Sequence, residues 1–430
     1  MRVLFIVPYV PSLVRVRPYQ LIRNLAARGH EVTVATVCTS EREQVEADEL
    51  RQHCAGVKAV HLSRGRSLLN CLRATAIGEP LQAHYSWSND LAEEVEALAP
   101  AMDVVHVEHL RGVRYGLVAQ RVTDSPVVWD SVDCISYLFE QSLSRRTDPL
   151  GRFVNRLELP RTRRYEASLF WRFSRTVITA EADRQAMLAL PPSPRPDSPL
   201  RSSSANRLIA AVDRNAAISV VPNGVDTSYF TPTEDARDPA SVVFSGKMSY
   251  HANVCACEHL ISRIMPLVWA LRPEVKVAVV GKDPPRALRR LADRYGPLVT
   301  VTGTVPDVRP FLGRATAAVV PLLYGAGSQF KILEAMACAT PVVATPKAVS
   351  ALDVDIGRDV LVAESTEDFA ASLLRLLESP GLQRAVGQAG RRYVETHHPW
   401  ERIAEQLEAI YQGAVSQPRP TLLASAVSAR

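Results

Sequence analysis

Short apolar runs alternate with segments rich in helix-forming residues along most of the chain. The clearest case begins with an apolar run at 317–322, which is short enough to be a buried strand. A loop with Gly325 and Gly327 follows, and the segment 329–338 then predicts a helix, which a proline ends. The run at 342–344 predicts a second buried strand. The pattern therefore predicts a βαβ unit with a glycine loop before its helix.

The same alternation opens the chain. The run at 3–7 predicts a buried strand, the segment 17–28 has apolar residues at helical spacing, and 31–37 predicts the next strand. Further along, 102–107 and 126–129 also predict buried strands. Ligands gather at the carboxyl ends of the strands in doubly wound sheets, so polar residues that follow these runs are candidate site residues.

Candidate residues follow both of these later strands. His106 and His109 lie at the end of 102–107, and Asp130 and Asp133 follow 126–129. The two acids suggest contacts to an acceptor molecule, although Asp133 equally suits the cap of the next helix. The histidines suit either a ligand or a structural role.

Two arginines lie in the loop after the first strand. Arg15 and Arg17 precede the first predicted helix. They could meet a phosphate or an anionic acceptor, or they could be surface arginines at a helix start.

The glycine loop before the helix at 329–338 predicts an anion site. The first N–H groups of a helix lack partners within it, and the helix dipole attracts phosphate. Gly327 and Ser328 let a phosphate approach the backbone, and Lys331 adds a cation about one turn into the helix. Glu334 lies on the same face, where a carboxylate suits two sugar hydroxyls. The alternative is an ordinary packing unit without a ligand.

The segment KILEAMACATPVVAT at 331–345 strongly resembles the donor-nucleotide segment of family 4 glycosyltransferases, retaining enzymes with the two-domain GT-B fold. The resemblance implies that Glu334 binds the ribose diol of a sugar nucleotide. It also implies that amides near Gly327 and Ser328, with Gln329 beside them, hold the diphosphate. The family usually carries a second Glu eight positions before the first, and Ala326 stands there.

Other segments resemble the same family. LAARGHEVTV at 25–34 is similar to its N-terminal opening, and PNGVD at 222–226 to the start of its second domain. Many members follow the strand at 241–244 with Gly-Arg and a Lys six residues later, two cations that bind the diphosphate. This chain has Lys247 and then Asn253, so we expect Lys247 and Lys331 to supply the positive charge that binds the diphosphate.

The resemblance completes the predicted site. Family members hold the base with backbone groups near the position of Val305, and they place a His beside the donor sugar. The predicted donor site therefore comprises Gly246, Lys247, Gly281, Val305, Gly327, Ser328, Gln329, Lys331 and Glu334. The predicted catalytic residues are His109, His106, Lys247 and Lys331, and the acceptor side has Arg15, Arg17, Asp130 and Asp133.

The stretch 145–175 is the most basic part of the chain, with many arginines, few acids, and interleaved apolar residues such as Phe153 and Leu157. This composition favours an amphipathic surface that lies on an anionic membrane. Nucleic acid is the other candidate partner, but no recognition motif supports it. A solvated helix face is the remaining alternative.

The composition of the chain says more about where the protein is located in the cell than about the reaction it catalyses. The net charge of +5 is too slight to argue for nucleic acid, and the seven cysteines lack metal-ligand spacing, which suits free thiols in a reducing cytosol. The first apolar run is too short for a signal peptide, and no run approaches the ~20 residues that span a bilayer. We expect a cytoplasmic protein, or one peripheral to the inner face of the membrane.

The expected fold is α/β: GT-B, with two Rossmann-like doubly wound domains that face each other across a cleft. The first domain spans 1–190 with a crossover helix at about 396–415, and the second spans 217–395. A Pro/Ser-rich insertion at 191–216 and a disordered tail at 416–430 complete the chain.

The resemblance implies transfer of a sugar, with retention, from a UDP- or GDP-type nucleotide sugar to a glycan or lipid-linked acceptor in polysaccharide or glycoconjugate biosynthesis. SGKMSYHAN and WDSVDCIS look similar to the bacterial exopolysaccharide sugar transferases, including the PEP-CTERM sorting type. A sugar-nucleotide 2-epimerase of the same fold is one alternative. A non-catalytic binder is another, because Ala326 and Asn253 depart from the family pattern. Nothing resembles a carboxylate metal site, so we expect no cofactor and no essential metal.

Overall fold

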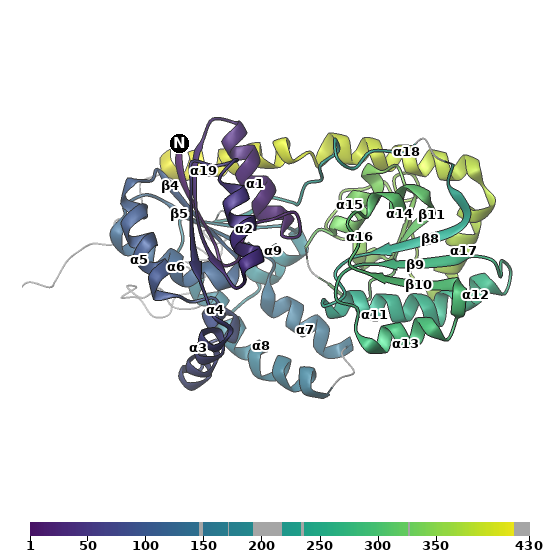
Figure 1. Cartoon of the computed structure of the whole chain (residues 1–430), viewed down its shortest axis with the longest axis horizontal. Helices are drawn as coiled ribbons and strands as arrows, with labels where there is room; N and C mark the ends of the chain where they lie inside the picture. Colours follow the sequence, from purple (N-terminus) through teal and green to yellow (C-terminus); the bar gives the residue numbers. More distant parts are fainter. Residues whose placement is uncertain (146–148, 171, 192–216, 234–235, 326, 417–430) are drawn as a thin grey trace, which may run out of the picture. The chain divides into compact units, whose positions relative to one another are not determined.

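The computed structural model describes residues 1–145, 149–170, 172–191, 217–233, 236–325 and 327–416. The chain divides into two compact units, Met1–Val221 with Ile403–Arg430 (unit 1) and Pro222–Arg402 (unit 2) (Figure 1). Apart from residues 191 and 416, the predicted insertion and the predicted tail lie outside the described residues.

Unit 1 is built on a parallel sheet which, in the described residues, has seven strands in the order β3-β2-β1-β4-β5-β6-β7. Its strands are β1 (Arg2–Val7), β2 (Glu31–Cys38), β3 (Gly56–His61), β4 (Val104–Glu108), β5 (Val127–Val132), β6 (Arg175–Ile178) and β7 (Ile218–Val220). The strand order reverses between β1 and β4, where loops at the carboxyl ends diverge and leave room for a ligand.

Helices connect these strands and pack on the sheet (Figure 1). They are α1 (Val16–Ala27), α2 (Glu41–Leu50), α3 (Arg64–Ile77), α4 (Leu81–Tyr85), α5 (Asn89–Leu98), α6 (His109–Val122), α7 (Ile135–Arg145), α8 (Pro149–Leu169), α9 (Glu181–Leu188) and α19 (Trp400–Ser416). Every residue of β4 is buried, because helices cover parallel sheets on both faces. This burial explains why the strands appear as continuous apolar runs in the sequence.

Unit 2 repeats this architecture with a parallel sheet whose described strands run in the order β10-β9-β8-β11-β12-β13. Its strands are β8 (Asp238–Ser245), β9 (Lys276–Val280), β10 (Val299–Gly303), β11 (Ala315–Val320), β12 (Val342–Ala344) and β13 (Leu361–Val362). Its helices are α11 (His251–His259), α12 (Met265–Trp269), α13 (Arg286–Asp293), α14 (Arg309–Arg314), α15 (Phe330–Ala337), α16 (Pro346–Val349), α17 (Thr366–Glu378) and α18 (Pro380–His397). Here the strand order reverses between β8 and β11.

Side-chain caps fix several helix starts. Ser40 accepts a hydrogen bond from the backbone N–H of Glu43 at the start of α2, and Ser63 accepts one from Arg66 at the start of α3. Such a cap satisfies a backbone N–H that the helix leaves unpaired, and it contributes about 1 kcal/mol. Gly78 ends α3 with φ of 73°, a left-handed conformation that glycine adopts without strain.

The predicted start of the second domain at 217 is wrong, because β7 belongs to the sheet of unit 1. Thr176, Val177 and Ile178 of β6 pair in parallel with residues 218–220. Without this pairing β6 would be an edge strand with unpaired backbone groups. Apolar strands look alike in sequence, so the sequence alone does not show which sheet a strand joins. At the other end of the chain, α19 contains the return from unit 2 to unit 1.

No helix in the described parts of the chain combines the length and the hydropathy that a bilayer span requires.

Candidate functional site

The predicted donor residues of unit 2 surround the point where the strand order of its sheet reverses. Gly246 and Lys247 directly follow β8, and the loop between β11 and α15 contains Gly327, Ser328 and Gln329. β8 and β11 are hydrogen-bonded neighbours, so both loops leave the same edge of the sheet. Ligands of doubly wound sheets bind at this position.

Three glycines bring the backbones at the ends of β8, β9 and β10 close together. The N–H of Gly246 donates to the carbonyl of Val280 at 3.0 Å, and the N–H of Gly281 donates to the carbonyl of Gly303 at 3.2 Å. A Cβ on Gly281 would overlap the carbonyl oxygen of Gly246, so no other residue fits there without a shift of the backbone. This part of the site is therefore formed by backbone rather than by side chains.

Lys331 is the buried cation of this site. Its Nζ donates to Oδ1 of Asn253 at 3.0 Å and to Oε1 of Gln329 at 3.1 Å, and only 8% of the residue is exposed. Burial lowers the pKa of Lys331 to about 8, although the nearby Cys257 and Glu334 favour the charged form. Lys331 is therefore largely protonated at neutral pH and has two neutral partners that fix its direction.

Asn253 has a structural role beside the two predicted cations that its sequence position did not indicate. It was interpreted only as a lost cation, yet it accepts a hydrogen bond from Lys331 and donates one to the carbonyl of Lys247 at 2.8 Å. Asn253 thus ties the two predicted cations together. Its spacing of six residues from Lys247 marked the position in the sequence, but this contact depends on how α11 packs beside α15.

Glu334 lies near Lys331 on α15, as the helical spacing predicted, and is half-buried. Burial raises the pKa of Glu334 to about 7, and the charge of Lys331 lowers it in part. Within the described residues, no group donates a hydrogen bond to its carboxylate. A half-buried carboxylate without hydrogen-bond donors is costly to keep in a folded protein, so it is a candidate acceptor for the hydroxyls of a ligand.

Asn223 holds the loop before α15 in place, a role that the sequence did not indicate. The N–H of Asn223 donates to Oγ of Ser328 at 3.1 Å, and Nδ2 of Asn223 donates to the Ser328 carbonyl at 3.3 Å. Gly327 has φ of 65°, and the side chain of Gln329, the N-cap residue of α15, makes no capping hydrogen bond to the helix. The hydroxyl of Ser328 therefore positions the loop, which leaves the helix start available to an anion. Ala326 lies outside the described residues.

The two remaining donor-site predictions concern Lys247 and Val305. Lys247 is exposed on the loop after β8, where its ammonium group is open to solvent. Val305 follows β10 and packs partly buried against the core of unit 2. Both lie at the carboxyl edge of the sheet, as the strand pattern predicted.

In unit 1, the prediction that His106 is catalytic is wrong, because the side chain lies wholly in the core. His106 is 0% exposed, stacks on Phe5 with ring centroids 3.9 Å apart, and shares a hydrogen bond of 2.8 Å with the hydroxyl of Tyr411 on α19. Burial pushes the pKa of His106 well below its ordinary value. His106 therefore packs α19 onto the sheet and has no exposed surface for a ligand.

His109 remains as the candidate histidine, at the end of β4. It is half-buried, has φ of 63°, and its Nδ1 accepts a hydrogen bond from the N–H of Arg111 at 3.2 Å. Burial lowers the pKa of His109 to about 3, and the charge of Arg111 adds to this. The imidazole is therefore neutral at physiological pH and can only exchange hydrogen bonds with a ligand.

Arg17 and Asp130 form a buried ion pair rather than exposed acceptor contacts. The Nη2 of Arg17 lies 2.8 Å from Oδ2 of Asp130, and the two side chains are 4% and 0% exposed. The pair ties the start of α1 to the end of β5, so neither side chain is open to an acceptor. Arg15 is more exposed, pairs with Glu43 at 2.8 Å, and lies over the ring of Tyr9. The alternative of surface arginines fails for Arg17.

Asp133 does not cap the next helix, contrary to the structural alternative considered from the sequence. The first N–H groups of α7 are instead bound by Glu166 of α8, which accepts from Ile135 at 2.8 Å and from Ser136 at 3.2 Å. Burial, with the charge of Asp183, raises the pKa of Asp133 to about 7. A cap supplied by a distant helix leaves no local signal in the sequence.

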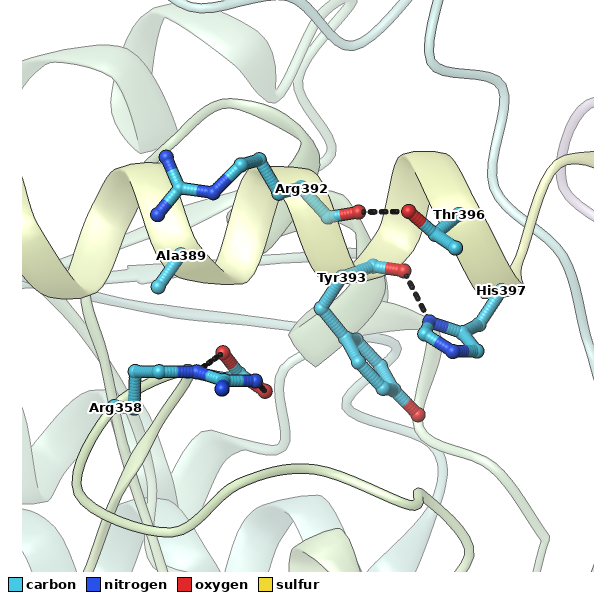
Figure 2. A pocket seen from close by; sticks show the side chains of 7 residues that line it. Arg358, Ala389, Arg392, Tyr393, Thr396 and His397 are labelled. Carbon is cyan, nitrogen blue, oxygen red and sulfur yellow. Dashed lines mark hydrogen bonds and ion pairs between the residues drawn. The ribbon is translucent and has the colours of Figure 1, made fainter.

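A surface pocket of about 330 Å³ lies elsewhere in unit 2, between α18 and the segment before β13 (Figure 2). Its wall contains Tyr393, Arg392 and Arg358, and Arg358 is paired with Asp355 and Asp359. None of the residues predicted for the donor lies in this wall. The balanced charges give the pocket no clear preference for an anion.

Two family models match the chain. Residues 14–197 match the model described as glycosyl transferase 4-like domain, and residues 239–379 match the one described as glycosyl transferases group 1. A curated relative is 29% identical over 231 residues, which is 50% of this chain and 60% of the relative. It is the GDP-mannose-dependent monoacylated alpha-(1-6)-phosphatidylinositol monomannoside mannosyltransferase of Corynebacterium glutamicum. The chain spans 47% to 65% of the length of the curated relatives it matches.

Solved structures match over nearly the whole chain. Sucrose-phosphate synthase from Thermosynechococcus elongatus superposes with a TM-score of 0.67 at 17% identity, covering 96% of this chain and 99% of that protein. HepE of Anabaena in complex with UDP and glucose gives a TM-score of 0.65 at 15% identity, covering 96% and 100%. With two Rossmann-like units and a match in each half, the chain contains both domains of a glycosyltransferase of the GT-B fold.

Proposed function

We propose that the protein transfers a glycosyl group, with retention at the anomeric carbon, from a nucleotide sugar to a glycan or lipid-linked acceptor. The observation that carries the proposal is the carboxylate of Glu334, which lies beside the buried Lys331 and has no donor among the described residues. This carboxylate takes the ribose diol of the donor. The start of α15 and the two lysines take the diphosphate.

Departure of the nucleotide diphosphate is the step that needs stabilisation, because negative charge grows on the leaving oxygen. Lys331 is held in place before the donor binds, so it stabilises that charge without reorganisation. Lys247 adds a flexible second cation from solvent. The proposal therefore includes no cofactor and no essential divalent ion.

The relatives suggest the class of donor and acceptor. The Corynebacterium relative is described as using GDP-mannose and a phosphatidylinositol mannoside, and the Anabaena structure contains UDP. We infer a UDP- or GDP-type donor and an acceptor carried on a lipid, with a role in the assembly of exopolysaccharide or another glycoconjugate. The seven cysteines lie among the described residues and form no disulfide there, which fits a reducing cytoplasmic compartment.

A thermal-shift screen against UDP-, GDP- and ADP-sugars tests donor binding. One nucleotide class should raise the melting temperature, because a ligand that binds only the folded state stabilises it. Slow hydrolysis of that donor without a change in sugar identity would favour a transferase over a 2-epimerase. No stabilisation by any nucleotide sugar would reject the transferase, the epimerase and the non-catalytic binder alike.

Lys247→Ala should reduce turnover more than donor affinity. The lysine is exposed, so its ground-state contribution is small, whereas its charge opposes the charge that grows in the transition state. Steady-state kinetics compared with donor titration would separate the two effects. Wild-type activity should survive a chelator, and loss of activity on chelation would assign the charge stabilisation to a metal instead.

His109→Ala should lower turnover by up to about tenfold, on the scale of one lost hydrogen bond between neutral groups. The neutral imidazole would bind a hydroxyl of the donor sugar, so His109→Gln should retain part of the activity. His106→Gln is the matched comparison and should act on stability only. Equal turnover for wild type and His109→Ala would remove His109 from the mechanism.

The stretch 145–175, which the sequence predicts to contact an anionic membrane, has fewer available arginines than its composition indicates. Arg161 is 14% exposed and pairs with Glu158, and Arg163 pairs with Glu140. Replacing Arg161 by Glu would therefore put a carboxylate beside the buried Glu158, whereas the pair of Arg163 with Glu140 is solvent-exposed and contributes little to stability. Contact with a membrane would involve the side chains that α8 exposes to solvent.

A further inference from the structure

The helix α3 of unit 1 is inverted, with its polar side toward the protein and its apolar side toward solvent. Its buried residues are Ser67, Asn70 and Ala74, and Nδ2 of Asn70 donates to the carbonyl of Trp87 at 2.8 Å. Its outer face exposes large apolar side chains, namely Leu68, Leu69, Leu72 and Ile77. Leu72 alone is 61% exposed. A surface helix normally has the opposite arrangement.

The helix α8 is inverted in the same way. Its buried side includes Asn155, Glu158 and Glu166. Glu158 accepts hydrogen bonds from the N–H of Leu81 at 2.7 Å and from Arg161, so the polar interior is satisfied. The outer face again exposes large apolar side chains, namely Leu150, Phe153, Val154 and Leu157. Phe153 is 66% exposed.

The two helices belong to one surface. α4 directly follows α3 and packs against it, and the N–H of Leu81 at the start of α4 donates to Glu158 of α8. The charge of Glu158 also acts on Cys71 of α3, whose pKa is raised mainly by burial and further by this carboxylate. Figure 1 draws α3 and α8 at the same end of unit 1. Close to half of the large apolar side chains that the described residues expose lie on these two helices.

The charges on this surface have one sign. α3 contains no acid, and both acids of α8 are buried. The exposed charged side chains on the two helices are arginines: Arg64, Arg73, Arg152, Arg156 and Arg164. In the part of the chain that the structure describes, Arg152 and Arg156 form no ion pair. The surface therefore presents large apolar side chains flanked by arginines, of which Arg152 and Arg156 have no counter-charge among the described residues.

We propose that the outer faces of α3 and α8 are a docking surface for an anionic lipid bilayer. The leucines and Phe153 enter the interface between headgroups and acyl chains, and the arginines meet lipid phosphates. A protein partner would need acids opposite arginines on two separate helices, whereas an anionic bilayer supplies negative charge along the whole surface. The inference deepens the proposed function, because it rests on a lipid-linked acceptor for its purpose, yet it is testable without any donor.

Co-sedimentation with vesicles tests the proposal on the full chain, in buffer without nucleotide sugar. One vesicle type is an equal mixture of phosphatidylcholine and phosphatidylglycerol, and the other is phosphatidylcholine alone. Wild type should bind the mixed vesicles. Leu72→Glu, Phe153→Glu and Arg156→Glu should each lower the bound-to-free ratio about tenfold or more, because each puts a negative charge at the bilayer surface.

Matched controls lie in unit 2. Leu271 is 70% exposed and Arg384 is exposed on α18, so Leu271→Glu and Arg384→Glu make the same chemical changes away from the surface. Both should bind vesicles as wild type does. High salt should weaken wild-type binding without abolishing it, since the apolar contacts are not screened. Circular dichroism of each variant confirms that it is folded.

Four results would overturn the proposal. Wild type could ignore mixed vesicles at low salt, or the outer-face variants could bind them as wild type does. Light scattering could also show a wild-type dimer that Leu72→Glu and Phe153→Glu dissociate, which would make the surface an interface between copies of this chain. Equal binding to both vesicle types would refute the role of the arginines. Donor titration of the same variants keeps a failure of docking separate from a failure of the proposed transfer reaction.

Discussion

Replacing Glu334 by Ala is expected to raise the dissociation constant for the nucleotide sugar at least tenfold while the fold stays intact. The carboxylate is half-buried, and no described residue donates a hydrogen bond to it, so its acceptor capacity is available to a ligand. Two ribose hydroxyls would make charge-assisted hydrogen bonds of about 1.5–3 kcal/mol each. Loss of only one such bond already corresponds to about a tenfold change. Isothermal titration of wild type and variant measures the effect.

The pH dependence of the same titration separates a binding role from a structural one. The pKa of Glu334 is raised to about 7, so the carboxylate is mostly ionised above that pH and gains a proton as the pH falls through it. Donor affinity should therefore weaken on the acid side of about pH 7. Glu334→Gln keeps the shape and one acceptor oxygen but cannot titrate, so its affinity should be lower and flatter with pH. An unchanged dissociation constant for Glu334→Ala would refute the assignment.

The part of the site on α15 was predictable because its residues are close to one another in the sequence. Strand, glycine loop and helix succeed one another within about thirty residues in such units. The helical period alone then brings Lys331 and Glu334 to one face. Gly281 differs from these residues, because it is required by the carbonyl of Gly246 at the end of a neighbouring strand. Residues whose roles follow from backbone geometry can be found by reading along the chain.

Roles that depend on packing between distant segments were not predictable. Asn253 lies 78 residues before Lys331 and still accepts its hydrogen bond, and Asn223 holds Ser328 across 105 residues. The sequence showed Asn253 only as an absent charge. Its actual role, to direct a lysine, follows from the way α11 and α15 pack together.

The errors in unit 1 have a related cause. His106 and His109 are three residues apart near the same strand end, so the sequence could not rank them. The side chain of His106 points into the core, under α19, whereas His109 leaves the sheet in a left-handed conformation. Arg17 and Asp130 were each predicted to be open to an acceptor, but they neutralise each other. Burial of charged groups depends on partners far away in the chain.

On α3 and α8 the difference from expectation is that apolar side chains, rather than charged ones, are exposed. Composition alone marked α8 as basic and apolar, but it did not show which residues face outward. The structure reverses the usual expectation, since Glu158 is 2% exposed and Phe153 is 66% exposed. A polar interior of this kind has to be satisfied by hydrogen bonds, and Leu81 and Arg161 provide them. The sequence of an inverted helix shows one polar and one apolar face. Which face lies against the protein depends on the neighbouring elements, so the sequence of the helix alone does not show it.

Replacing Lys331 by Met is expected to lower turnover by about 100-fold, with a smaller effect on donor affinity. Methionine keeps much of the length and apolar stem but removes the ammonium group that, in the proposed reaction, would stabilise the leaving diphosphate. Loss of one preorganised donor to a developing negative charge has an effect of this size. Because the hydrogen bonds to Asn253 and Gln329 exist before the donor binds, the lysine mainly stabilises the transition state. Single-turnover kinetics, compared with donor titration, measures both quantities.

The pH profile gives a second and independent test of Lys331. Its pKa is lowered to about 8 by burial, so in the free protein the ammonium group loses its proton as the pH rises through that value. The quantity kcat/KM should therefore fall on the alkaline side of about pH 8. A bound diphosphate favours the charged lysine, so the alkaline limb of kcat should lie at higher pH than that of kcat/KM. Lys331→Met should lose this limb altogether. If the variant keeps the same alkaline limb, the titrating group is not Lys331, and the charge on the leaving phosphate has to be met by Lys247 or by the start of α15.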